Sequence, residues 1–343
     1  MLKSNILVVF GGKSEEYEVS LRSSVSVLRG IQRHKYNIYL IGITKEGKML
    51  LPEFNLERIA NDTWSEGALP VKIDFSTGCV DSLPKIDVAL PIVHGSFCED
   101  GRLQSLFELL GVRYVGADTL SSALCMHKGL TKRLASTLGI PVARGFEVDR
   151  IRLSDINGIL KGAKNIGYPV FVKPCSSGSS RGASPIMQSE ELLPAIKEAF
   201  KYSDSVLIEE LINGKECEIG ALELPTGELR LSCVGALRHG GKFYDYNEKY
   251  INGTTKYEIP ASIPPEISEK IRDYAHTLFR FFNLRGLARL DFFVTENGKI
   301  YFNEINTLPG FTEASMYPML FNLEGYTMGG LIDALIDTCV NKI

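Results

Sequence analysis

The chain has 343 residues, of which 44% are hydrophobic and 23% are charged, and its formal net charge is −3. A chain of about twice the usual domain length is expected to fold into two or three lobes. The near-neutral charge argues against nucleic acid as a partner. No apolar run approaches the roughly 20 residues of a membrane-spanning helix, so we expect no membrane association.

The cysteines and the N-terminal residues bear on location. Seven cysteines are scattered along the chain, and no two of them form a CxxC pair. An odd number without such spacing predicts neither a disulfide framework nor a zinc site. The apolar run at 5–10 is too short for a secretory signal and lacks a cleavage site of small residues. We therefore expect reduced thiols and a cytoplasmic protein.

Buried strands alternate with helices in the first part of the chain, which we assign to an N-terminal α/β lobe at 1–120. The apolar run at 5–10 stops at Gly11 and Gly12, and apolar residues then recur with helical spacing. This order predicts a parallel sheet. The predicted elements are strands at 5–10, 37–43 and 86–93 and helices at 18–32 and 102–111.

Two further lobes are predicted after residue 120. A glycine- and serine-rich loop at 175–184, flanked by strands, marks a smaller central lobe at 121–210. The C-terminal lobe, 211–343, contains a polar, glycine-containing lid loop at 238–257. The predicted elements are a helix at 120–138, strands at 169–173, 205–210, 216–223 and 229–236, a helix at 265–282, a hairpin at 287–305 and a last helix near 326–341.

The hairpin is the most informative of these elements. Asn297 and Gly298 join its two strand-like runs, which is a strong signal for a two-residue turn. That turn fixes a register in which Asp291 lies opposite Glu304. Directly opposed side chains are roughly 5 Å apart, so these carboxylates repel one another unless a cation lies between them. Mg²⁺ is commonly held by one or two carboxylates, and we predict that it binds here.

The same register places Arg289 opposite Asn306, on the face that carries the acidic pair. Asn306 would add a neutral oxygen ligand, and Arg289 would face the same anion as the metal. The alternative is a solvent-facing hairpin whose acidic pair is balanced by Arg289. Phe293, predicted opposite Phe302, would form an apolar floor for a nucleotide base, although core packing explains both aromatics nearly as well.

A second candidate is the segment 173–182, in which Lys173 ends a strand and a loop of serines and glycines follows. Hydroxyl groups and backbone N–H groups of such loops bind phosphate. The loop is not the GxxxxGK[ST] loop of kinases and GTPases, and the turn at Gly11 lacks the GxGxxG of dinucleotide binders. Read alone, the loop is equally consistent with a mobile surface linker. Lys128, which precedes a predicted helix, is a second candidate phosphate contact, but read alone it is consistent with a solvated surface lysine.

Strand ends supply two more candidates. Residues 11–20 follow the first strand at its carboxyl end, where open α/β sheets bind ligands. Acidic residues that begin a helix also complement its dipole, which is the simpler explanation. His94 follows the strand at 86–93, and residues 99–101 turn the chain into the next helix. A lone histidine is more often structural than catalytic.

Together these segments resemble the D-alanine-D-alanine ligase family over nearly the whole chain. The matching segments, in order, are FGGKSEEYEVSLRS (10–23), HGSFCEDGRLQ (94–104), Lys128 at its helix start, FVKPCSSGSSRG (171–182), IEELINGKEC (208–217), FYDYNEKY (243–250), GLARLDFF (286–293) and FNEINTLPGFTEASMYP (302–318). Residues 118–126 and 243–260 are particularly similar to the vancomycin-resistance ligases that place D-serine second.

The resemblance implies a three-lobed ATP-grasp fold with ATP between the central and C-terminal lobes. It implies that Asp291, Glu304 and Asn306 bind two Mg²⁺ ions, with Mn²⁺ as a substitute. The implied ATP contacts are Lys128, Lys173, Ser180 and Lys249 for phosphates, Glu209, Glu210 and Leu211 for the adenine edge, and Glu216 for the ribose. The implied substrate and catalytic contacts are Glu16 for the first ammonium group, Ser179 and Tyr250 for tying the lid loop to Glu16, Arg289 and Gly310 for the oxyanion, His94 near the first substrate, and Ser315 and Met316 in the second pocket.

Four positions depart from the usual wording of the family. Cys98 and Ser105 stand where glycine is usual, His127 replaces the acid before Lys128, and Pro185 replaces a lysine. None removes a metal ligand, so they bear on the fit of the first-substrate pocket and on turnover. Met316 stands where leucine is familiar in D-alanine enzymes.

The implied function is the joining of two D-alanine molecules through a D-alanyl phosphate, for peptidoglycan precursor synthesis, by a homodimer. One alternative keeps this chemistry with D-serine, or less readily D-lactate, as the second substrate, and Tyr250 argues against lactate. The other alternative is a nucleotide-binding homologue without ligase activity. Intact Asp291, Glu304 and Lys173 argue against that second alternative.

Overall fold

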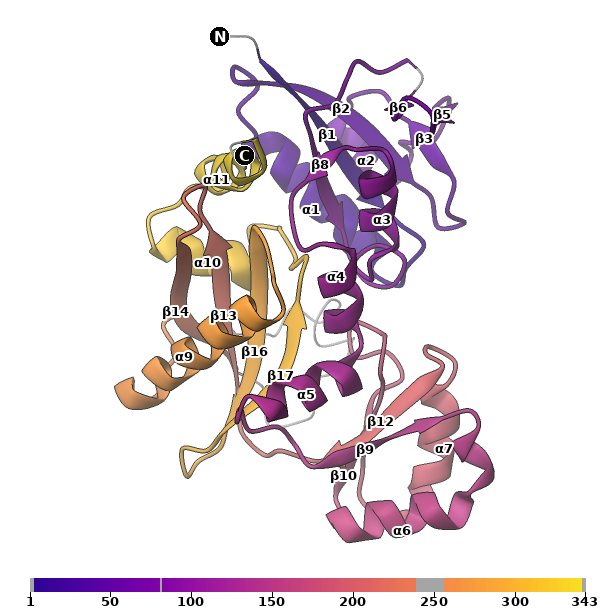
Figure 1. Ribbon diagram of the computed structural model, residues 1–343, viewed down its shortest axis with the longest axis vertical. Helices are drawn as coiled ribbons and strands as arrows, with labels where there is room; N and C mark the ends of the chain where they lie inside the picture. Colours follow the sequence, from indigo (N-terminus) through magenta and orange to yellow (C-terminus); the bar gives the residue numbers. More distant parts are fainter. Residues whose placement is uncertain (1–2, 81, 239–255, 341–343) are drawn as a thin grey trace.

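The computed structural model describes residues 3–80, 82–238 and 256–340. Its strands form three main sheets, and the described part of the chain contains no helix that is both long and apolar enough to cross a membrane. Figure 1 shows the N-terminal sheet at the top, the C-terminal sheet in the middle and the central-lobe sheet at the bottom. Most of the predicted lid loop at 238–257, including Lys249 and Tyr250, lies outside the described residues.

The N-terminal sheet has the strand order β4-β3-β2-β1-β7-β8. Its core is parallel as predicted, because β1 (Ser4–Gly11) lies between β2 (Tyr36–Ile43) and β7 (Val88–Val93). Continuous apolar runs form these strands because helices cover them. The other elements of this lobe are β3 (Met49–Leu51), β4 (Leu69–Pro70), β5 (Ile73–Asp74), β6 (Cys79–Val80), β8 (Arg113–Tyr114), α1 (Tyr17–Gly30), α2 (Leu56–Ala60) and α3 (Arg102–Leu109).

Two helices connect the N-terminal sheet to the central one, where a single helix at 120–138 was predicted. They are α4 (Thr119–Met126) and α5 (Lys128–Thr137). His127 separates them because its backbone is extended, with φ −91° and ψ 91°. Its Nδ1 accepts a hydrogen bond from the backbone N–H of Leu130, so the imidazole caps α5. The break makes Lys128 the first residue of α5.

The central sheet is antiparallel, with the order β11-β10-β12-β9. Two helices pack against it, and their apolar faces form a separate core with the strands, around residues such as Val172, Leu192 and Ile208. The elements are β9 (Gly145–Asp149), η1 (Arg152–Ser154), α6 (Ile156–Ile166), β10 (Val170–Pro174), β11 (Ser184–Ile186), α7 (Ser189–Ala199) and β12 (Ser205–Glu210). The glycine- and serine-rich loop connects β10 to β11.

The C-terminal sheet is antiparallel, with the order β15-β14-β13-β16-β17. Helix α9 packs against β13 and β14, and α10 contacts the same two strands. Phe321 of α10 lies against Gly220, whereas the neighbouring Ile219 belongs to the core under α9, so the helices cover opposite faces. The elements are β13 (Lys215–Glu223), β14 (Leu229–Arg238), β15 (Lys256–Glu258), α9 (Pro265–Phe281), β16 (Leu287–Val294), β17 (Ile300–Asn306), α10 (Met316–Leu323) and α11 (Met328–Val340).

The C-terminal helix α11 returns to the N-terminal lobe and packs against α1, as Figure 1 shows. One apolar cluster therefore includes β1 and β7 together with Leu335 of α11 and Phe321 of α10. Lys35 and Gln32 add polar contacts to Asp333 at 2.5 and 2.6 Å. One face of the C-terminal sheet thus shares a core with the N-terminal lobe, whereas its face under α9 and the central sheet each have a core of their own.

The hairpin differs from the prediction in its turn. Thr295 donates its N–H to the carbonyl of Lys299 and accepts from Gly298, so the turn has three residues between these ends rather than two. A bulge then adds Asn303 to β17, because Asp291 pairs with Glu304 but Phe292 pairs with Phe302. The two irregularities compensate, and the predicted pairing of Asp291 with Glu304 is confirmed. The predicted pairing of Phe293 with Phe302 is wrong, since Phe293 faces Tyr301.

Candidate active site

A cavity lies where the three lobes meet, and we call it the central cavity. Eight residues singled out from the sequence line it: Glu16, His94, Lys128, Ser179, Arg289, Glu304, Asn306 and Gly310. They come from the residue before α1, the loop after β7, the start of α5, the loop after β10, the hairpin and the loop after β17. Residues separated by almost 300 positions in the chain thus meet at one site, and their side chains are mostly charged or polar.

A row of three carboxylates crosses the C-terminal sheet beside this cavity. Asp291 of β16 pairs with Glu304 on one side and with Glu218 of β13 on the other. Arg289 lies next to this row, with its Nε and Nη2 2.8 Å from the two oxygens of Asp291. Its Nε is also 3.0 Å from Glu218 Oε2. One guanidinium group therefore balances two buried carboxylates.

These side chains fit a hard divalent cation. Burial raises the pKa of Asp291, although Arg289 opposes the shift, so this carboxylate requires positive charge to stay ionised. The carboxylate oxygens now contact N–H donors of Arg289, Asn306 and Lys128. The Asn306 amide nitrogen is 2.9 Å from Asp291 Oδ2, and Lys128 Nζ is 3.1 Å from Glu304 Oε2. A half-turn of the Asn306 amide would present its oxygen instead. Two carboxylates and an amide oxygen are ligands that Mg²⁺ accepts.

The lysine at the start of α5 connects the loop after β10 to the hairpin. Lys128 Nζ donates to the carbonyl of Ser177 at 2.6 Å, and its backbone N–H donates to the carbonyl of Cys175 at 2.9 Å. Because the same Nζ reaches Glu304, this ammonium group lies between a phosphate-type loop and the acidic row. A phosphate group in the cavity would meet a cation that is already held in place.

Lys173, at the end of β10, belongs to a buried cluster of charges. Its Nζ lies 2.7 Å from Glu209 Oε1 and 3.0 Å from Asn303 Oδ1. Lys132 of α5 holds the other oxygen of Glu209 at 2.5 Å. Burial lowers the pKa of Lys132 to about 8, whereas the charges of Glu209 and Glu304 raise that of Lys173 in spite of burial. Sequence reasoning did not single out Lys132.

The residues at the end of β12 were predicted to meet the adenine edge. The side chain of Glu209 is turned to the two lysines, and Glu210 accepts from Arg144, whose Nε is 2.9 Å away. The N–H of Leu211 donates to the carbonyl of Pro169 at 3.3 Å. These side chains therefore stabilise the central lobe, and an adenine ring would have to meet backbone atoms here.

Glu16 joins the N-terminal lobe to the loop after β10. Ser179 donates its hydroxyl to Glu16 Oε1, and both residues line the central cavity. Ser179 and Ser180 have positive φ angles of 50° and 56°, and such left-handed residues occur in loops whose successive N–H groups bind anions. A Cβ atom on Gly178 would lie 2.5 Å from Glu16 Oε2, so glycine leaves room for this carboxylate, and a larger residue would displace it.

His94 is buried and uses both ring nitrogens. Its Nδ1 lies 2.9 Å from the carbonyl of Leu308, which can only accept, so Nδ1 carries the proton. Its Nε2 lies 3.1 Å from Ser23 Oγ, which in turn accepts from the N–H of Phe311. Burial lowers the pKa of His94, in agreement with a neutral ring. The histidine lines the cavity but holds the loop after β17.

The sequence pattern predicts only a turn at Glu99, yet this residue lines the central cavity. It is buried, and burial together with the charge of Glu16 raises its pKa to about 8. Glu218 was also missed, although its alternation with Glu216 in a predicted strand was a usable signal. In the structure Glu216, Glu218 and Asp291 bring carboxylate oxygens within 4.8 Å of one another.

Several predicted residues do not line the cavity. Met316 is buried against Leu237 and Leu320. Ser315 accepts a hydrogen bond from the N–H of Thr312 at 3.1 Å, which shapes the turn after Gly310. Phe293 is partly exposed beside Glu216 across the strand pair.

Comparison with known proteins gives one family. The family model described as D-ala D-ala ligase N-terminus matches residues 5–117, and that described as D-ala D-ala ligase C-terminus matches residues 134–337. The D-alanine--D-alanine ligase of Acetivibrio thermocellus is 41% identical over 99% of this chain and 96% of that protein.

Solved structures give the same result. The VanG D-Ala:D-Ser ligase from Enterococcus faecalis superposes with a TM-score of 0.90 at 36% identity, covering 99% of this chain and 100% of that one. The D-alanine-D-alanine ligase from Coxiella burnetii gives a TM-score of 0.87 at 33% identity, covering 99% and 94%.

Proposed function

The chain belongs to the D-alanine-D-alanine ligase family, and we propose that it joins two D-alanine molecules in a reaction that converts ATP to ADP and phosphate. The product would serve peptidoglycan precursor synthesis in the cytoplasm. The observation that carries the proposal is the meeting of Glu304 from the acidic row, Lys128 and Glu16 at one cavity. These are groups that phosphoryl transfer to a carboxylate requires.

ATP would bind between the central and C-terminal sheets. Lys128 is supported as a phosphate contact because its ammonium group reaches both Ser177 of the loop after β10 and Glu304 of the hairpin. Lys173 is supported because its buried ammonium group lies between Glu209 and Asn303 of the hairpin. The backbone N–H of Ser180 would be a further phosphate contact. The proposed contacts for the rest of the nucleotide are Glu209, Glu210 and Leu211 for the adenine edge, Glu216 for the ribose and Phe293 for the base.

Asp291, Glu304 and Asn306 would hold magnesium, and we propose two ions. Bound there, Mg²⁺ offsets the negative charge of the phosphate groups. Without Mg²⁺ the row of carboxylates would repel the phosphate groups of a nucleotide. Arg289 would remain next to the acidic row, directed at the reacting carboxyl group.

In the first step, an oxygen of the first D-alanine carboxylate attacks the γ-phosphorus, and the bond to the leaving oxygen of ADP breaks. The product is D-alanyl phosphate. Glu16 would hold the ammonium group of this D-alanine, because its carboxylate lines the cavity opposite the acidic row. Lys128 would offset charge on the transferring phosphoryl group.

In the second step, the amine of the second D-alanine attacks the acyl carbon and gives a tetrahedral oxyanion. Arg289 and the N–H of Gly310 would stabilise that oxygen. The oxyanion then collapses with release of phosphate, and the amine loses its extra proton to solvent. The loop anchored by Ser179 on Glu16 would keep water from the acyl phosphate. Lys249 and Tyr250, proposed for the same closure, lie outside the described residues.

A second candidate has D-serine as the acceptor. It is favoured by the structural similarity to the VanG D-Ala:D-Ser ligase at a TM-score of 0.90. The choice would be made in the second pocket, for which we propose Ser315 and Met316 next to Gly310. Met316 would act from behind that pocket, because it is buried against Leu320. We also propose that the protein acts as a homodimer.

Phosphate release with ATP, Mg²⁺ and D-alanine alone, followed by mass analysis of the product, tests the proposal. D-alanyl-D-alanine is the expected product. The same assay with D-alanine plus D-serine or D-lactate identifies a mixed-product enzyme. Absence of product with every pair, in a protein that still binds ATP, would favour the binding-only alternative and overturn the proposed activity.

A further inference from the structure

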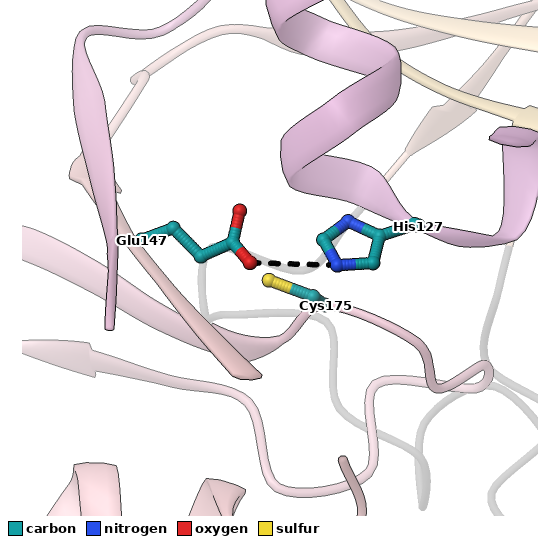
Figure 2. A group of neighbouring side chains, drawn as sticks. All are labelled: His127, Glu147 and Cys175. Atoms are coloured by element: carbon teal, nitrogen blue, oxygen red, sulfur yellow. Dashed lines mark ion pairs between the residues drawn. The ribbon is translucent and has the colours of Figure 1, made fainter. Parts of the chain in front are cut away.

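A cluster of three potential metal ligands lies behind the loop that follows β10. Figure 2 shows His127 from the junction of α4 and α5, Glu147 from β9 and Cys175 from the start of the loop, with their polar ends directed at one another. The ligand atoms all lie within 4.8 Å of one another, and His127 Nε2 is 3.4 Å from Glu147 Oε1. The three residues are far apart in sequence, so no motif spacing reveals them.

The surroundings of this cluster keep it compact. Cys175 is fully buried, whereas the side chains of His127 and Glu147 are 23% and 24% exposed, which leaves a path for an ion. Gly129 permits the approach, because a Cβ atom there would lie 2.6 Å from Glu147 Oε2. Ser205 Oγ, 3.2 Å from His127 Nε2, adds a further oxygen.

The geometry points to a binding site for a divalent transition-metal cation of the Zn²⁺ class, formed by His127, Glu147 and Cys175. A nitrogen, an oxygen and a sulfur ligand suit Zn²⁺, which usually takes four ligands in a tetrahedron. Ser205 or a water molecule would be the fourth. Mg²⁺ would not compete, because it prefers oxygen ligands. This site is therefore separate from the acidic row in chemistry as well as in place.

Binding would exchange protons for the metal. The thiol of Cys175 is protonated without a cation, since burial raises its pKa to about 11 while Ser205 and the backbone at Gly129 oppose that shift. Coordination releases this proton. His127 Nδ1 now accepts from the N–H of Leu130, so Nε2 carries the ring proton. A metal on Nε2 moves that proton to Nδ1, and Leu130 loses its acceptor.

The cluster lies next to a residue of the central cavity. The backbone N–H of Lys128 donates to the carbonyl of Cys175 at 2.9 Å, and Lys128 Nζ reaches Ser177 in the same loop. A metal bound to His127 and Cys175 would thus cross-link the start of α5 to the start of the loop. The site itself does not depend on the proposed ligase activity, and it can be tested without ATP.

The test is titration of the reduced, full-length protein with Co²⁺, in excess Mg²⁺ to occupy oxygen sites, with a phosphine reductant. We expect one equivalent of Co²⁺ to give intense tetrahedral absorption and a thiolate-to-cobalt band, both removed by Zn²⁺. Cys175→Ser should abolish the band. His127→Asn, which retains a capping side chain for Leu130, and Glu147→Gln should each weaken Zn²⁺ binding at least tenfold, measured against a chromophoric chelator.

Two variants serve as matched controls, since Cys79 and His276 are exposed and far from the cluster in sequence. Cys79→Ser and His276→Asn should leave Zn²⁺ affinity unchanged. Zn²⁺ should also speed hydrogen exchange at the Leu130 amide, a readout independent of the affinities. A wild-type protein without the band, or a band that survives in folded Cys175→Ser, would overturn the inference. Circular dichroism establishes that each variant is folded.

Discussion

His94 holds Leu308 through a hydrogen bond of 2.9 Å from Nδ1 to the carbonyl oxygen, across 214 residues of chain. The bond connects the end of β7 to the loop that carries Gly310. Because Ser23 occupies Nε2, both nitrogens of the ring are engaged within the protein. His94 is therefore better placed to position the loop than to exchange protons with a substrate.

We expect His94→Ala to lower the free energy of unfolding by about 1–3 kcal/mol, since it leaves the buried Leu308 carbonyl without its donor. Turnover should fall more than the KM for ATP rises, because the N–H of Gly310 would be displaced. Urea unfolding and steady-state kinetics measure these effects. His94→Gln restores a donor and should recover part of the loss. A histidine acting as a base would instead remove a limb of the pH-rate profile.

Glu304→Gln should abolish Mg²⁺-dependent phosphate release and leave the fold intact. The variant keeps the size of the side chain but removes one of the two opposed carboxylates. Glu296→Gln is the matched control, because Glu296 is exposed in the turn of the same hairpin. Phosphate release by Glu304→Gln at the rate of this control would show that the metal assignment is wrong.

Lys132 should make nucleotide binding depend on pH. Below its pKa of about 8, the cluster of Lys132, Glu209 and Lys173 has one excess positive charge, and above that pH it has none. We expect the Kd for ATP to rise several-fold between about pH 7 and 9, and to rise less in Lys132→Met, in which only the ionisation of Glu99 remains over this range. Calorimetric titration at each pH measures this. A flat wild-type profile would contradict the assignment.

The same group affects stability with a definite sign. Its pKa is lowered in the folded protein from an ordinary value of 10.5, so between about pH 8 and 10.5 the unfolded chain binds more protons. The contribution of Lys132 to stability therefore rises with pH over that window, by an amount of the order of 1–3 kcal/mol. The difference in unfolding free energy between wild type and Lys132→Met should change accordingly.

Glu99 should change the stability of the protein with pH in the opposite direction. Its folded pKa is raised to about 8 from an ordinary value of 4.5, so between these values the folded protein binds more protons than the unfolded chain. Stability is lost as pH rises through this window. Glu99→Gln should therefore become more stable relative to wild type as pH increases from about 5 to 8.5, by a few kcal/mol. Urea unfolding at both pH values checks the direction.

The hairpin shows how sequence reasoning can reach a correct contact through an incorrect detail. A two-residue turn and an unbroken ladder were expected, but a longer turn shifts the register by one residue, and Asn303 shifts it back. The predicted pairing of Asp291 with Glu304, which lies beyond the bulge, is confirmed. The predicted pairing of Phe293 with Phe302, which lies between the turn and the bulge, is wrong. The bulge also has a use, since Asn303 binds Lys173.

Other features depended on long-range contacts that no local pattern reports. By contrast, local patterns were sufficient to predict the parallel N-terminal sheet, from its apolar runs, and the antiparallel hairpin, from its turn. Lys132 resembled any lysine on a helix, and only the fold brings it to Glu209, 77 residues away. Met316 was assigned from the family pattern, yet its side chain faces the core. The helices α6, α7 and α10 were also not predicted.

The separate core of the central sheet has a consequence for the order in which the protein opens. Since one apolar cluster joins the N-terminal sheet to α10 and α11 of the C-terminal lobe, these elements should lose their slowest-exchanging amides together. The central sheet, held to them by polar contacts such as Ser179 to Glu16 and Lys173 to Asn303, should exchange as a unit of its own. A nucleotide that bridges both units would merge them into one cooperative transition.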